Sequence, residues 1–574
     1  MKNVRFVAFL GLASLHSVAA NAQVAPPDAG QLLNEQQRQG KPQERPASPQ
    51  PLIEAEPADS GENGGFRARV ERVRFTGDTT LVDEASLRAA VAGAMGKELS
   101  HAQMRVLAQQ VGAVLQEQGY LLARAYLPSQ DLSDGELEIA ILAGRLQNAP
   151  GRVQVLSTDP ALAGRLEAIA DAALPEGAVH NRQLERALLL INDVPGVQAR
   201  AALEKGAEPG SSRLLVKAET PRDWSVGGAV DNYANRYTGQ WRTSAWASLD
   251  RPLGREDQLG ASIVHSRGST LAGLNYSIGL NPHGLRANLA ASWMDYEVGE
   301  EFKSLELEGE ARTISAGLSY PLLRTRARNL WLSVDAEHKQ LTDRALGVVL
   351  RERRLDKATA MLAGSAWDDW GGGGYTGAGI GVVAGRLDLR NDLDRRMDAL
   401  TARTDGSFSK LTWRAERSQS LAGLAGWGVY LGASGQFARK NLDSSEKFLL
   451  GGPQGVRGAP VGEAGGDSGW LANAELRHDL RFHDAVAAQA VLFADHGGVR
   501  QHIDSWPGSV NPWTGNRYEL SSLGLGLNLQ GERWGLRSAW AHRLGDNPGR
   551  SAAGLNADGR KRDQYLWLQL SVRI

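Results

Sequence analysis

The sequence has no cysteine among its 574 residues, no excess of either charge, and no long hydrophobic run beyond residue 22. The absence of cysteine excludes a disulfide framework, so stability must come from backbone pairing and core packing. A net charge of −1 argues against a nucleic-acid binder, in which clustered Lys and Arg are expected. No later segment approaches the roughly 18 apolar residues that a spanning helix needs. A membrane protein made from this chain must therefore span the bilayer with strands.

The first 22 residues have the features of a secretory signal peptide. Lys2 and Arg5 precede an apolar run over residues 6–15, and the small-residue site Ala20-Asn21-Ala22 follows it. We therefore expect residues 1–22 to be removed on export.

Residues 23–65 divide into two parts. Leu32, Leu33 and Gln36 can share one face of a helix over residues 28–39, and we expect residues 23–40 to form an N-terminal plug helix. Residues 41–65 are rich in Pro, Glu and Ser, a composition that favours an extended linker. The alternative is a disordered tail.

Two copies of a small α+β unit are expected over residues 66–146 and 147–220. Each copy has the order strand, helix, helix, strand, strand. In the first copy, helices are predicted from about residue 83 and from about residue 100, and the second helix has a buried stripe formed by Met104, Leu107, Val111 and Leu115. The other predicted elements are strands 69–75, 121–127 and 135–142 in the first copy, and strand 153–156, helices 160–174 and 181–191, and a hairpin over 198–218 turning at 208–210 in the second.

From residue 221 to residue 574 the helical period disappears, and apolar residues alternate with polar ones. A period of two places successive side chains on opposite faces of a strand, and about ten residues cross a bilayer when tilted. The clearest segments are 566–574, 523–530 and 330–337. About sixteen such segments can be drawn, and 67 glycines and 15 tryptophans suit a Gly-rich barrel with aromatic girdles. The pattern predicts a transmembrane β-barrel of about sixteen antiparallel strands.

One of these segments, residues 305–312, carries charged residues at every second position, namely Glu306, Glu308, Glu310 and Arg312. Because carboxylates on a lipid face are costly, we expect this face to line a watery lumen.

The connections agree with a barrel whose two ends both lie in the periplasm. Even-numbered connections are then tight turns, and odd-numbered ones are surface loops. Short breaks fall at even connections, at residues 281–284, 483–484 and 531–532, and long segments fall at odd ones, at residues 441–469, 497–519 and 544–563. Together with the signal peptide, this indicates a bacterial outer membrane, with the two small units in the periplasm.

Two motifs lie in the predicted barrel. Residues 451–458, in the eleventh connection, form Gly-Gly-Pro-Gln-Gly-Val-Arg-Gly, and residues 493–497, in the thirteenth strand, form Phe-Ala-Asp-His-Gly. With the tandem units and the barrel, these motifs resemble the two-partner secretion translocators, the ShlB/FhaC/HecB family of haemolysin secretion/activation proteins. The small units resemble polypeptide-transport-associated (POTRA) domains, with the motif positions Gly77, Leu127, Pro128, Gln130 and Gly135.

In this family, the loop that carries the first motif folds back into the barrel, and its arginine pairs with the strand aspartate. The resemblance therefore implies a latch between Arg457 and Asp495 and an inward fold for residues 441–469. The parity of the strand agrees independently, because Asp495 shares a face with Gln489, whereas Leu492 lies on the apolar face. The expected supporting positions are Gly452, Val456, Gly458, Phe493 and Gly497. A planar guanidinium that grips a carboxylate can fix such a loop.

The resemblance implies a transport protein, without enzymatic activity or a cofactor. Its POTRA domains would recognise an unfolded exoprotein with an N-terminal secretion domain, and the barrel pore would pass it to the cell surface. Outer-membrane lipid, lipopolysaccharide and, during biogenesis, the barrel-assembly machinery are further expected partners, and nucleic acid is not. Two alternatives stay open, an outer-membrane assembly factor of the same superfamily and a passive porin. The cargo stays open between a haemolysin, an adhesin and a contact-dependent toxin.

Two positions depart from the family pattern, and two short patterns imitate enzymes. Ala459 stands where the family commonly has an aromatic residue, and Ile574 stands where such barrels commonly end in Phe. Residues 466–469, Gly-Asp-Ser-Gly, resemble a serine-protease signature, and residues 379–384 resemble a dinucleotide-binding loop, but neither has the required context. His478, His483 and His496 lack the spacing of metal ligands.

Overall fold

The computed structural model describes residues 25–39, 53–54, 67–148, 151–174, 176–207, 211–483, 485–510 and 515–574. The predicted signal peptide, most of the predicted linker and the predicted turn at residues 208–210 lie outside these residues. Within them, no helix is both long enough and apolar enough to cross a membrane.

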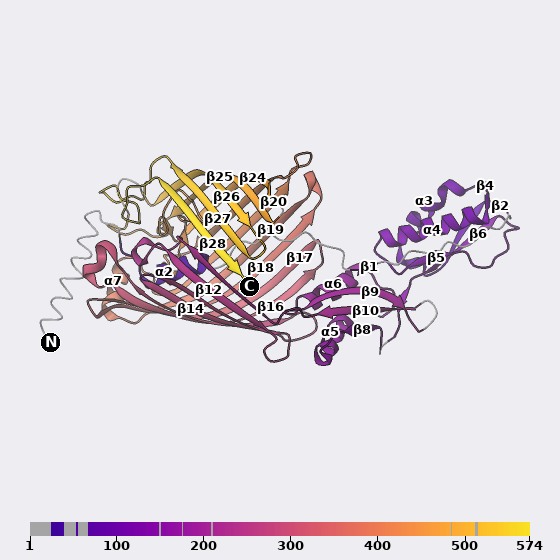
Figure 1. The fold of residues 1–574 in the computed structure, drawn as a ribbon, viewed down its shortest axis with the longest axis horizontal. Coiled ribbons are helices and arrows are strands. Elements are labelled where there is room, and N and C mark those ends of the chain that lie inside the picture. The colour runs from indigo at the N-terminus through magenta and orange to yellow at the C-terminus, as the bar shows by residue number, and fades with distance from the viewer. Residues whose placement is uncertain are drawn as a thin grey trace.

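Sixteen antiparallel strands form a closed barrel, on the left of Figure 1, which confirms the predicted architecture. Closure comes from five residue pairs between the last strand and the first. The strands are β11 (Trp224–Asp231), β12 (Arg242–Asp250), β13 (Asp257–Ser266), β14 (Ser269–Gly279), β15 (Arg286–Glu297), β16 (Glu308–Arg324), β17 (Arg328–Ala345), β18 (Val348–Asp368), β19 (Gly374–Leu389), β20 (Gly406–Ser420), β21 (Trp427–Ala438), β24 (Ser468–His483), β25 (Val486–Arg500), β26 (Arg517–Gln530), β27 (Trp534–Leu544) and β28 (Gln564–Arg573).

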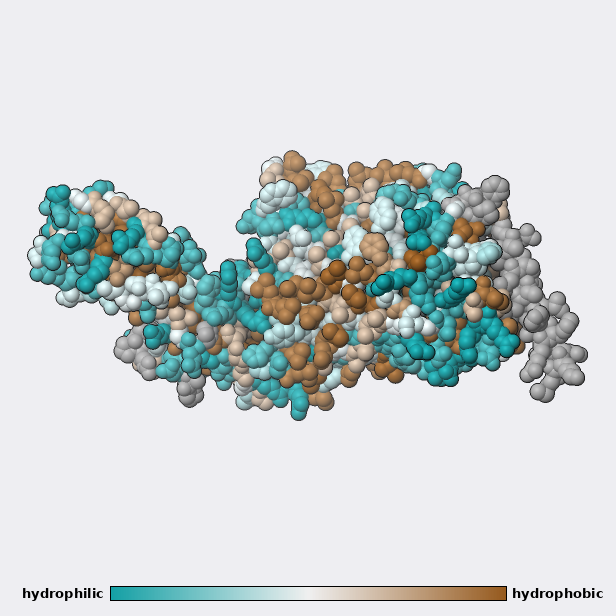
Figure 2. Space-filling model, turned by 180° about the vertical axis from the view of Figure 1, so that it is seen from behind, coloured by the Kyte–Doolittle hydropathy of each residue, from teal (hydrophilic) through white to brown (hydrophobic). Residues whose placement is uncertain are grey.

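The two faces of the barrel wall differ in polarity, as the alternating pattern predicts. In β28, Leu566, Leu570 and Val572 are exposed on the outer face, whereas Tyr565 and Trp567 are buried on the lumen side. Figure 2 shows hydrophobic residues gathered over the wall, between polar surfaces at the two ends. This distribution suits a barrel whose middle is set in a bilayer.

The prediction that Glu306, Glu308 and Glu310 line the lumen is wrong. Glu306 lies outside the strand, in a left-handed conformation after the 3₁₀ helix η4 (Glu300–Leu305). Glu308 and Glu310 project from the outer face of β16. The side chains between and beside them, such as Ala311, are buried toward the lumen, and successive side chains of a strand point to opposite faces.

Strand length explains the error. β16 has 17 residues, more than the roughly ten that cross a bilayer, so its first residues extend beyond the apolar band into water. There Glu310 lies 2.9 Å from Arg312 and 3.5 Å from Arg344, both on the outer face. Charged side chains can therefore point outward in this part of the strand. The alternating pattern alone does not show that this part lies beyond the apolar band.

The first small unit contains a three-stranded sheet of order β3-β6-β5 and a two-stranded sheet of β2 and β4, packed against helices. Its elements are β2 (Arg67–Val70), β3 (Arg72–Gly77), η1 (Thr79–Leu81), α3 (Glu84–Val91), η2 (Ala92–Ala94), β4 (Lys97–Ser100), α4 (His101–Glu117), β5 (Arg124–Tyr126) and β6 (Glu136–Leu142). Asp83 caps α3, and a capping box of Ser100 and Gln103 starts α4. The predicted stripe on α4 is buried as expected. The predicted strand 69–75 is instead two strands, and β4 was missed.

The second small unit has one sheet and two helices. Its elements are β7 (Arg145–Leu146), β8 (Val153–Leu156), α5 (Pro160–Ala173), α6 (Asn181–Asn192), β9 (Gln198–Lys205) and β10 (Ser211–Glu219). β10 pairs with β7, β8 and β9, and β1 (Ile53–Glu54), from the predicted linker, adds in parallel to β9 at Ala201 and Ala202. Part of that linker is therefore paired, unlike the unpacked chain that its composition predicts.

The second unit docks on one end of the barrel, here called the near end, and the opposite end is called the far end (Figure 1). α6 and the residue that follows it contribute to this contact: Asp193 forms a two-point ion pair with Arg324 of β16, at 2.6 and 2.9 Å. Arg186 also donates a hydrogen bond of 3.2 Å to the carbonyl of Pro321. The far end carries the longer connections, including η3 (Arg236–Thr238) and α7 (Asp392–Leu400), and the near end carries short turns such as the one containing η5 (Trp370–Gly372).

Candidate functional site

The sixth connection at the far end, residues 439–467, is here called loop 6, and it folds into the barrel lumen. It contains η6 (Ser444–Glu446), β22 (Phe448–Leu449) and β23 (Gly465–Gly466), and β22 pairs with β23. Val456 and Ala459 are fully buried in a cluster with lumen-facing side chains of the wall, such as Leu471 and Val499. Ala459, the position at which the family commonly has an aromatic residue, therefore lies inside a packed core.

Arg457 lies at the tip of loop 6 and pairs with Asp495 of β25. Its Nη2 is 2.6 Å and its Nε 2.9 Å from the two carboxylate oxygens, and its backbone N–H donates to Oδ2 at 3.0 Å. The Asp495 side chain has no exposed surface and that of Arg457 is 13% exposed. The structure thus brings together the two residues that the family resemblance pairs.

Further residues complete this site. Glu475 of β24 accepts from Nη1 of Arg457 at 2.8 Å, and Arg477 lies 2.7 Å from the same carboxylate. Asn473 and Ser522 donate to Asp495 at 2.8 and 3.0 Å. Sequence reasoning missed these four residues. The signal that could have found them is the register of the strands. β24 and β26 pair with β25, the strand that carries Asp495, so their inward-facing residues opposite Asp495 are candidates for the site.

The supporting motif residues shape the loop and its seat. Phe493 is buried with its ring centroid 3.4 Å from the Arg457 guanidinium carbon, a cation–π contact. Gly452 has φ of 106°, a conformation that favours glycine. A Cβ at Gly458 would lie 2.7 Å from the Ser522 Cβ, and one at Gly497 would lie 2.5 Å from a Leu450 methyl group. These glycines therefore let loop 6 approach the wall.

The base of loop 6 is held by a second ionic cluster. Glu446 is buried, and its carboxylate lies 2.8 Å from each of Lys339, Lys357 and Lys410, which project from β17, β18 and β20. Burial alone would raise the pKa of Glu446, but the three ammonium groups hold it well below its usual range. The charge is therefore retained, and loop 6 is fixed at its base as well as at its tip.

Helix α2 (Ala29–Gln39) lies inside the barrel (Figure 1). Ala29, Leu32 and Leu33 are buried against lumen-facing side chains such as Tyr296 and Leu341.

The same helix follows the first part of loop 6. Asn34 donates to the Lys447 carbonyl at 2.9 Å, and Arg38 donates to the Leu449 and Gln454 carbonyls. The lumen is thus occupied by two segments that contact each other.

The POTRA motif residues are structural. Gly77 and Gly135 have positive φ, and a Cβ at Gly77 would lie 2.3 Å from the Ile141 carbonyl. The Gln130 side chain bonds the N–H and the carbonyl of Glu138 at 2.6 and 2.9 Å, as a neighbouring strand would. Two further motif residues lie just before it: Leu127 packs on the core of the unit, and the Pro128 carbonyl accepts from Gln130.

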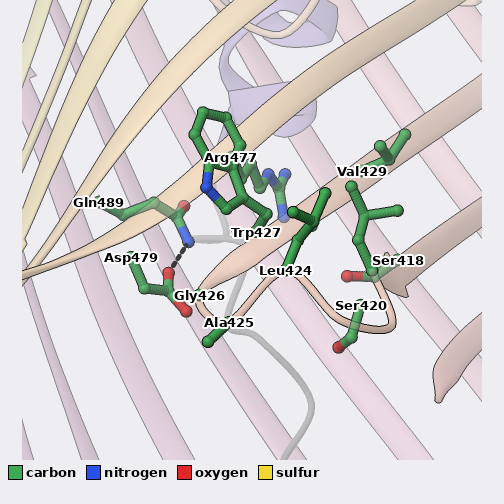
Figure 3. Close-up of a pocket in the computed structure, with 12 residues that line it drawn as sticks. Ser418, Ser420, Leu424, Ala425, Gly426, Trp427, Val429, Arg477, Asp479 and Gln489 are labelled. Carbon is green, nitrogen blue, oxygen red and sulfur yellow. Dashed lines mark hydrogen bonds between the residues drawn. The ribbon is translucent and has the colours of Figure 1, made fainter. Parts of the chain in front are cut away.

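A pocket of about 210 Å³ lies beside the near-end turn between β20 and β21 (Figure 3). Arg477, Asp479 and Gln489 line it, and Gln489 donates to Asp479 at 2.7 Å. Because Arg477 also pairs with Glu475, the ionic network that begins at Arg457 reaches this pocket.

The sites that imitate enzymes have structural roles. The Ser468 hydroxyl accepts from the Ala438 N–H, and residues 379–384 lie inside β19 rather than in a loop between a strand and a helix. His478 and His496 pack against Trp427 and Trp470. Across the described ranges, no three His, Cys, Asp or Glu residues are grouped as a metal site requires.

Comparison with known proteins identifies the family. Residues 210–529 match the model for haemolysin secretion/activation protein ShlB/FhaC/HecB, and residues 68–144 match the ShlB-type POTRA domain. The chain is 30% identical over 443 residues to the heme/hemopexin transporter protein HuxB of Haemophilus influenzae, covering 76% of each chain. The chain belongs to the ShlB/FhaC/HecB family.

Other members of the ShlB/FhaC/HecB family agree with this placement. The outer membrane transporter CdiB of Escherichia coli is 25% identical, with 88% of this chain and 86% of that protein covered. The solved structure of CdiB from Escherichia coli has the same fold, with a TM-score of 0.68 at 20% identity, covering 92% of this chain and 94% of that one. The protein is a two-partner secretion transporter, with its barrel in the outer membrane and its POTRA domains in the periplasm.

Proposed function

We propose that the POTRA domains capture one unfolded exoprotein and that the barrel lumen is its path to the cell surface. The observation that carries this proposal is the content of the lumen, helix α2 and loop 6. α2 is held there by side-chain contacts. In the sequence, residues 40–66 connect it to the first POTRA domain. Its departure would open space in the lumen without breaking any pairing of the barrel strands.

Loop 6 acts as a latch in this proposal. The Arg457–Asp495 pair holds the loop tip, with Glu475 as a third member, and the Glu446 cluster holds its base. Passage of cargo requires space that loop 6 now occupies. Rearrangement of contacts made by side chains supplies that space and leaves the strand ladder of the barrel intact.

Cargo recognition uses strand addition to an exposed sheet edge in this proposal. Edge strands offer unpaired backbone groups, and this mode tolerates varied sequences. β3 and β5 are the edges of the three-stranded sheet of the first POTRA domain, and β8 is an edge in the second. β9 is already partly covered by β1, so β3, β5 and β8 are the candidates.

The remaining partners follow from the surfaces. The apolar outer face contacts outer-membrane lipid and lipopolysaccharide, and β28, which ends next to Ile574, is the strand presented to the barrel-assembly machinery. The protein acts without a cofactor and catalyses no reaction. The relatives carry the names heme/hemopexin transporter protein HuxB, outer membrane transporter CdiB and hemolysin transporter protein ShlB, and the cargo of this chain is sought among secreted proteins encoded nearby.

The test deletes the gene for this protein in its host and compares the proteins in the culture supernatants of the deletion strain and the parent strain. A plasmid copy of the gene restored to the deletion strain is the control. We expect one large secreted protein to disappear from the supernatant, while other outer-membrane proteins keep their levels. A general loss of outer-membrane barrels would support an assembly factor instead. An unchanged supernatant with altered solute permeability would support a passive porin.

A direct binding test uses residues 66–219, since each POTRA unit has its own buried core. The fragment is expected to bind the N-terminal domain of the lost exoprotein and not a version that lacks this domain. Absence of binding would contradict recognition by the POTRA domains.

A further inference from the structure

Arg353 projects from β18 into the lumen, among three carboxylates from separate parts of the chain. Its Nη1 lies 2.7 Å from Asp443 of loop 6 and 3.3 Å from Asp28, just before α2, and its Nη2 lies 2.6 Å from Asp343 of β17. The Arg353 side chain is only 3% exposed. A guanidinium buried to this degree needs its counterions, so the three contacts are strong constraints.

Asp343 binds the first turn of α2. Its Oδ1 accepts the Ala29 N–H at 2.8 Å and the Tyr296 hydroxyl at 2.5 Å. A carboxylate at a helix N-terminus satisfies a free N–H and interacts favourably with the helix dipole. Here the barrel wall supplies this group to the helix, and Arg353 orients it.

Loop 6 meets α2 at the same point. The Ser444 hydroxyl donates to Asp28 at 2.7 Å and accepts from Arg353 at 3.1 Å. The backbones are so close that a Cβ at Gly30 would lie 2.4 Å from the Ser444 hydroxyl oxygen. The start of the helix and the base of the loop thus share one residue of the wall.

The charges at this point allow the helix to leave. If α2 departs with Asp28, Arg353 keeps Asp343 and Asp443, so no buried charge is left alone. If Arg353 loses its charge, the carboxylates face one another with only the half-exposed Arg351, 3.3 Å from Asp28, to balance them. Unpaired buried charges are strongly destabilising.

We propose that Arg353 is a positioning residue of the barrel wall that holds both the N-terminal helix, through Asp28 and Asp343, and the base of loop 6, through Asp443. The inference rests on the proposed plug role of the helix and adds a site at which helix and loop are held together. Two separable effects follow, one on channel opening and one on the exposure of loop 6.

The experiment uses the full-length chain and exploits its lack of cysteine. Arg353→Gln is compared with Arg354→Gln, the same change at the neighbouring position on the outer face, and heat-modifiability confirms barrel folding. In planar bilayers, Arg353→Gln is expected to raise the open fraction about ten-fold. In a Ser445→Cys background, it should raise the rate of thiol labelling by a similar factor, because Ser445 is buried beside Asp443.

Deleting residues 28–39 separates the two effects. In that background, Arg353→Gln should no longer change the open fraction but should still speed labelling, because Asp443 stays. Asp343→Asn should affect mainly opening and Asp443→Asn mainly labelling, and these variants carry the test if Arg353→Gln does not insert.

Equal behaviour of Arg353→Gln and Arg354→Gln in both assays would overturn the inference, and so would an effect on opening that persists without the helix. If deletion of residues 28–39 itself leaves the open fraction unchanged, the plug proposal fails. The labelling assay then still tests the hold of Arg353 on loop 6.

Discussion

The indole nitrogen of Trp567 donates a hydrogen bond of 2.8 Å to the backbone carbonyl of Arg457. Trp567 lies on β28, which pairs with β11 over only five residue pairs. The tip of loop 6 is therefore held on two sides. Asp495 binds the guanidinium of Arg457, and Trp567 of the last barrel strand binds the backbone carbonyl of Arg457. Any movement of the loop tip must break contacts to two separate parts of the wall.

We expect Arg457→Ala to abolish or sharply reduce secretion while the barrel still inserts, because Arg457 contributes to the lumen and not to the strand ladder. Asp495→Ala should be less severe, since Arg457 keeps Glu475 at 2.8 Å. Removing one member of a buried pair costs about 3 kcal/mol. Exoprotein in the supernatant is measured against heat-modifiable barrel, with Arg439→Ala, an exposed arginine of the same loop, as control.

Because Arg457 and Asp495 act as a unit, the double variant should lose no more than the worse single variant. Normal secretion by Arg457→Ala, or additive losses in the double variant, would contradict the latch.

Deletion of residues 28–65 should raise single-channel conductance, because α2 fills space in the lumen. Secretion itself is expected to survive, since a plug must leave for cargo to pass. A matched pair of point variants gives the same test without a deletion. Leu33→Asp should release the helix because Leu33 is buried, whereas Gln37→Asp, on the exposed face, should not. Unchanged conductance and antibiotic sensitivity in the deletion would exclude the plug.

Channel opening should depend on pH through Glu35. Burial raises the pKa of Glu35 to about 7 from an ordinary value of 4.5, against the hydrogen bonds from Gln31 and Asn235, and Asp28 raises it slightly further. The docked helix therefore prefers the neutral acid. Docking is strongest below about pH 4.5 and weakens as pH rises to about 7, by about 3 kcal/mol in total.

The open fraction should accordingly be higher at pH 7.5 than at pH 5, and Glu35→Gln should remove most of this difference. A wild-type open fraction that is constant across this range, or one that falls as pH rises, would contradict the assignment.

Local sequence patterns predicted much of the fold, because their physical causes are local. The period of two defined the barrel, and the Asp83 and Ser100 caps fixed the starts of the POTRA helices. The family motif supplied Arg457 and Asp495. Alternation misplaced Glu308 and Glu310 because it does not show how far a strand extends beyond the bilayer.

The residues that sequence reasoning missed depend on register and on distant chain segments. Glu475 joins the site only because β24 pairs with β25 in one register. Arg353 joins Asp28 just before the N-terminal helix, a neighbouring strand and loop 6, and Trp567 of the last strand reaches loop 6. No pattern within a short window links such residues.

The ion pair between Asp193 and Arg324 offers a test of how the second POTRA domain is oriented at the pore. It joins the end of α6 to β16 through two contacts, at 2.6 and 2.9 Å, and both side chains are partly buried. Asp193→Arg places two cations face to face, so we expect a several-fold loss of secretion. Arg324→Asp should behave alike, and the double charge swap should restore most of the secretion, because it recreates the pair in reverse.

Exoprotein in the supernatant is again compared with heat-modifiable barrel. Glu185→Arg, a charge reversal on the same helix, is the control for α6 itself. If both single variants secrete normally, the orientation of this domain does not depend on the pair. If the swap fails while its barrel inserts, the losses come from the individual side chains and not from their contact.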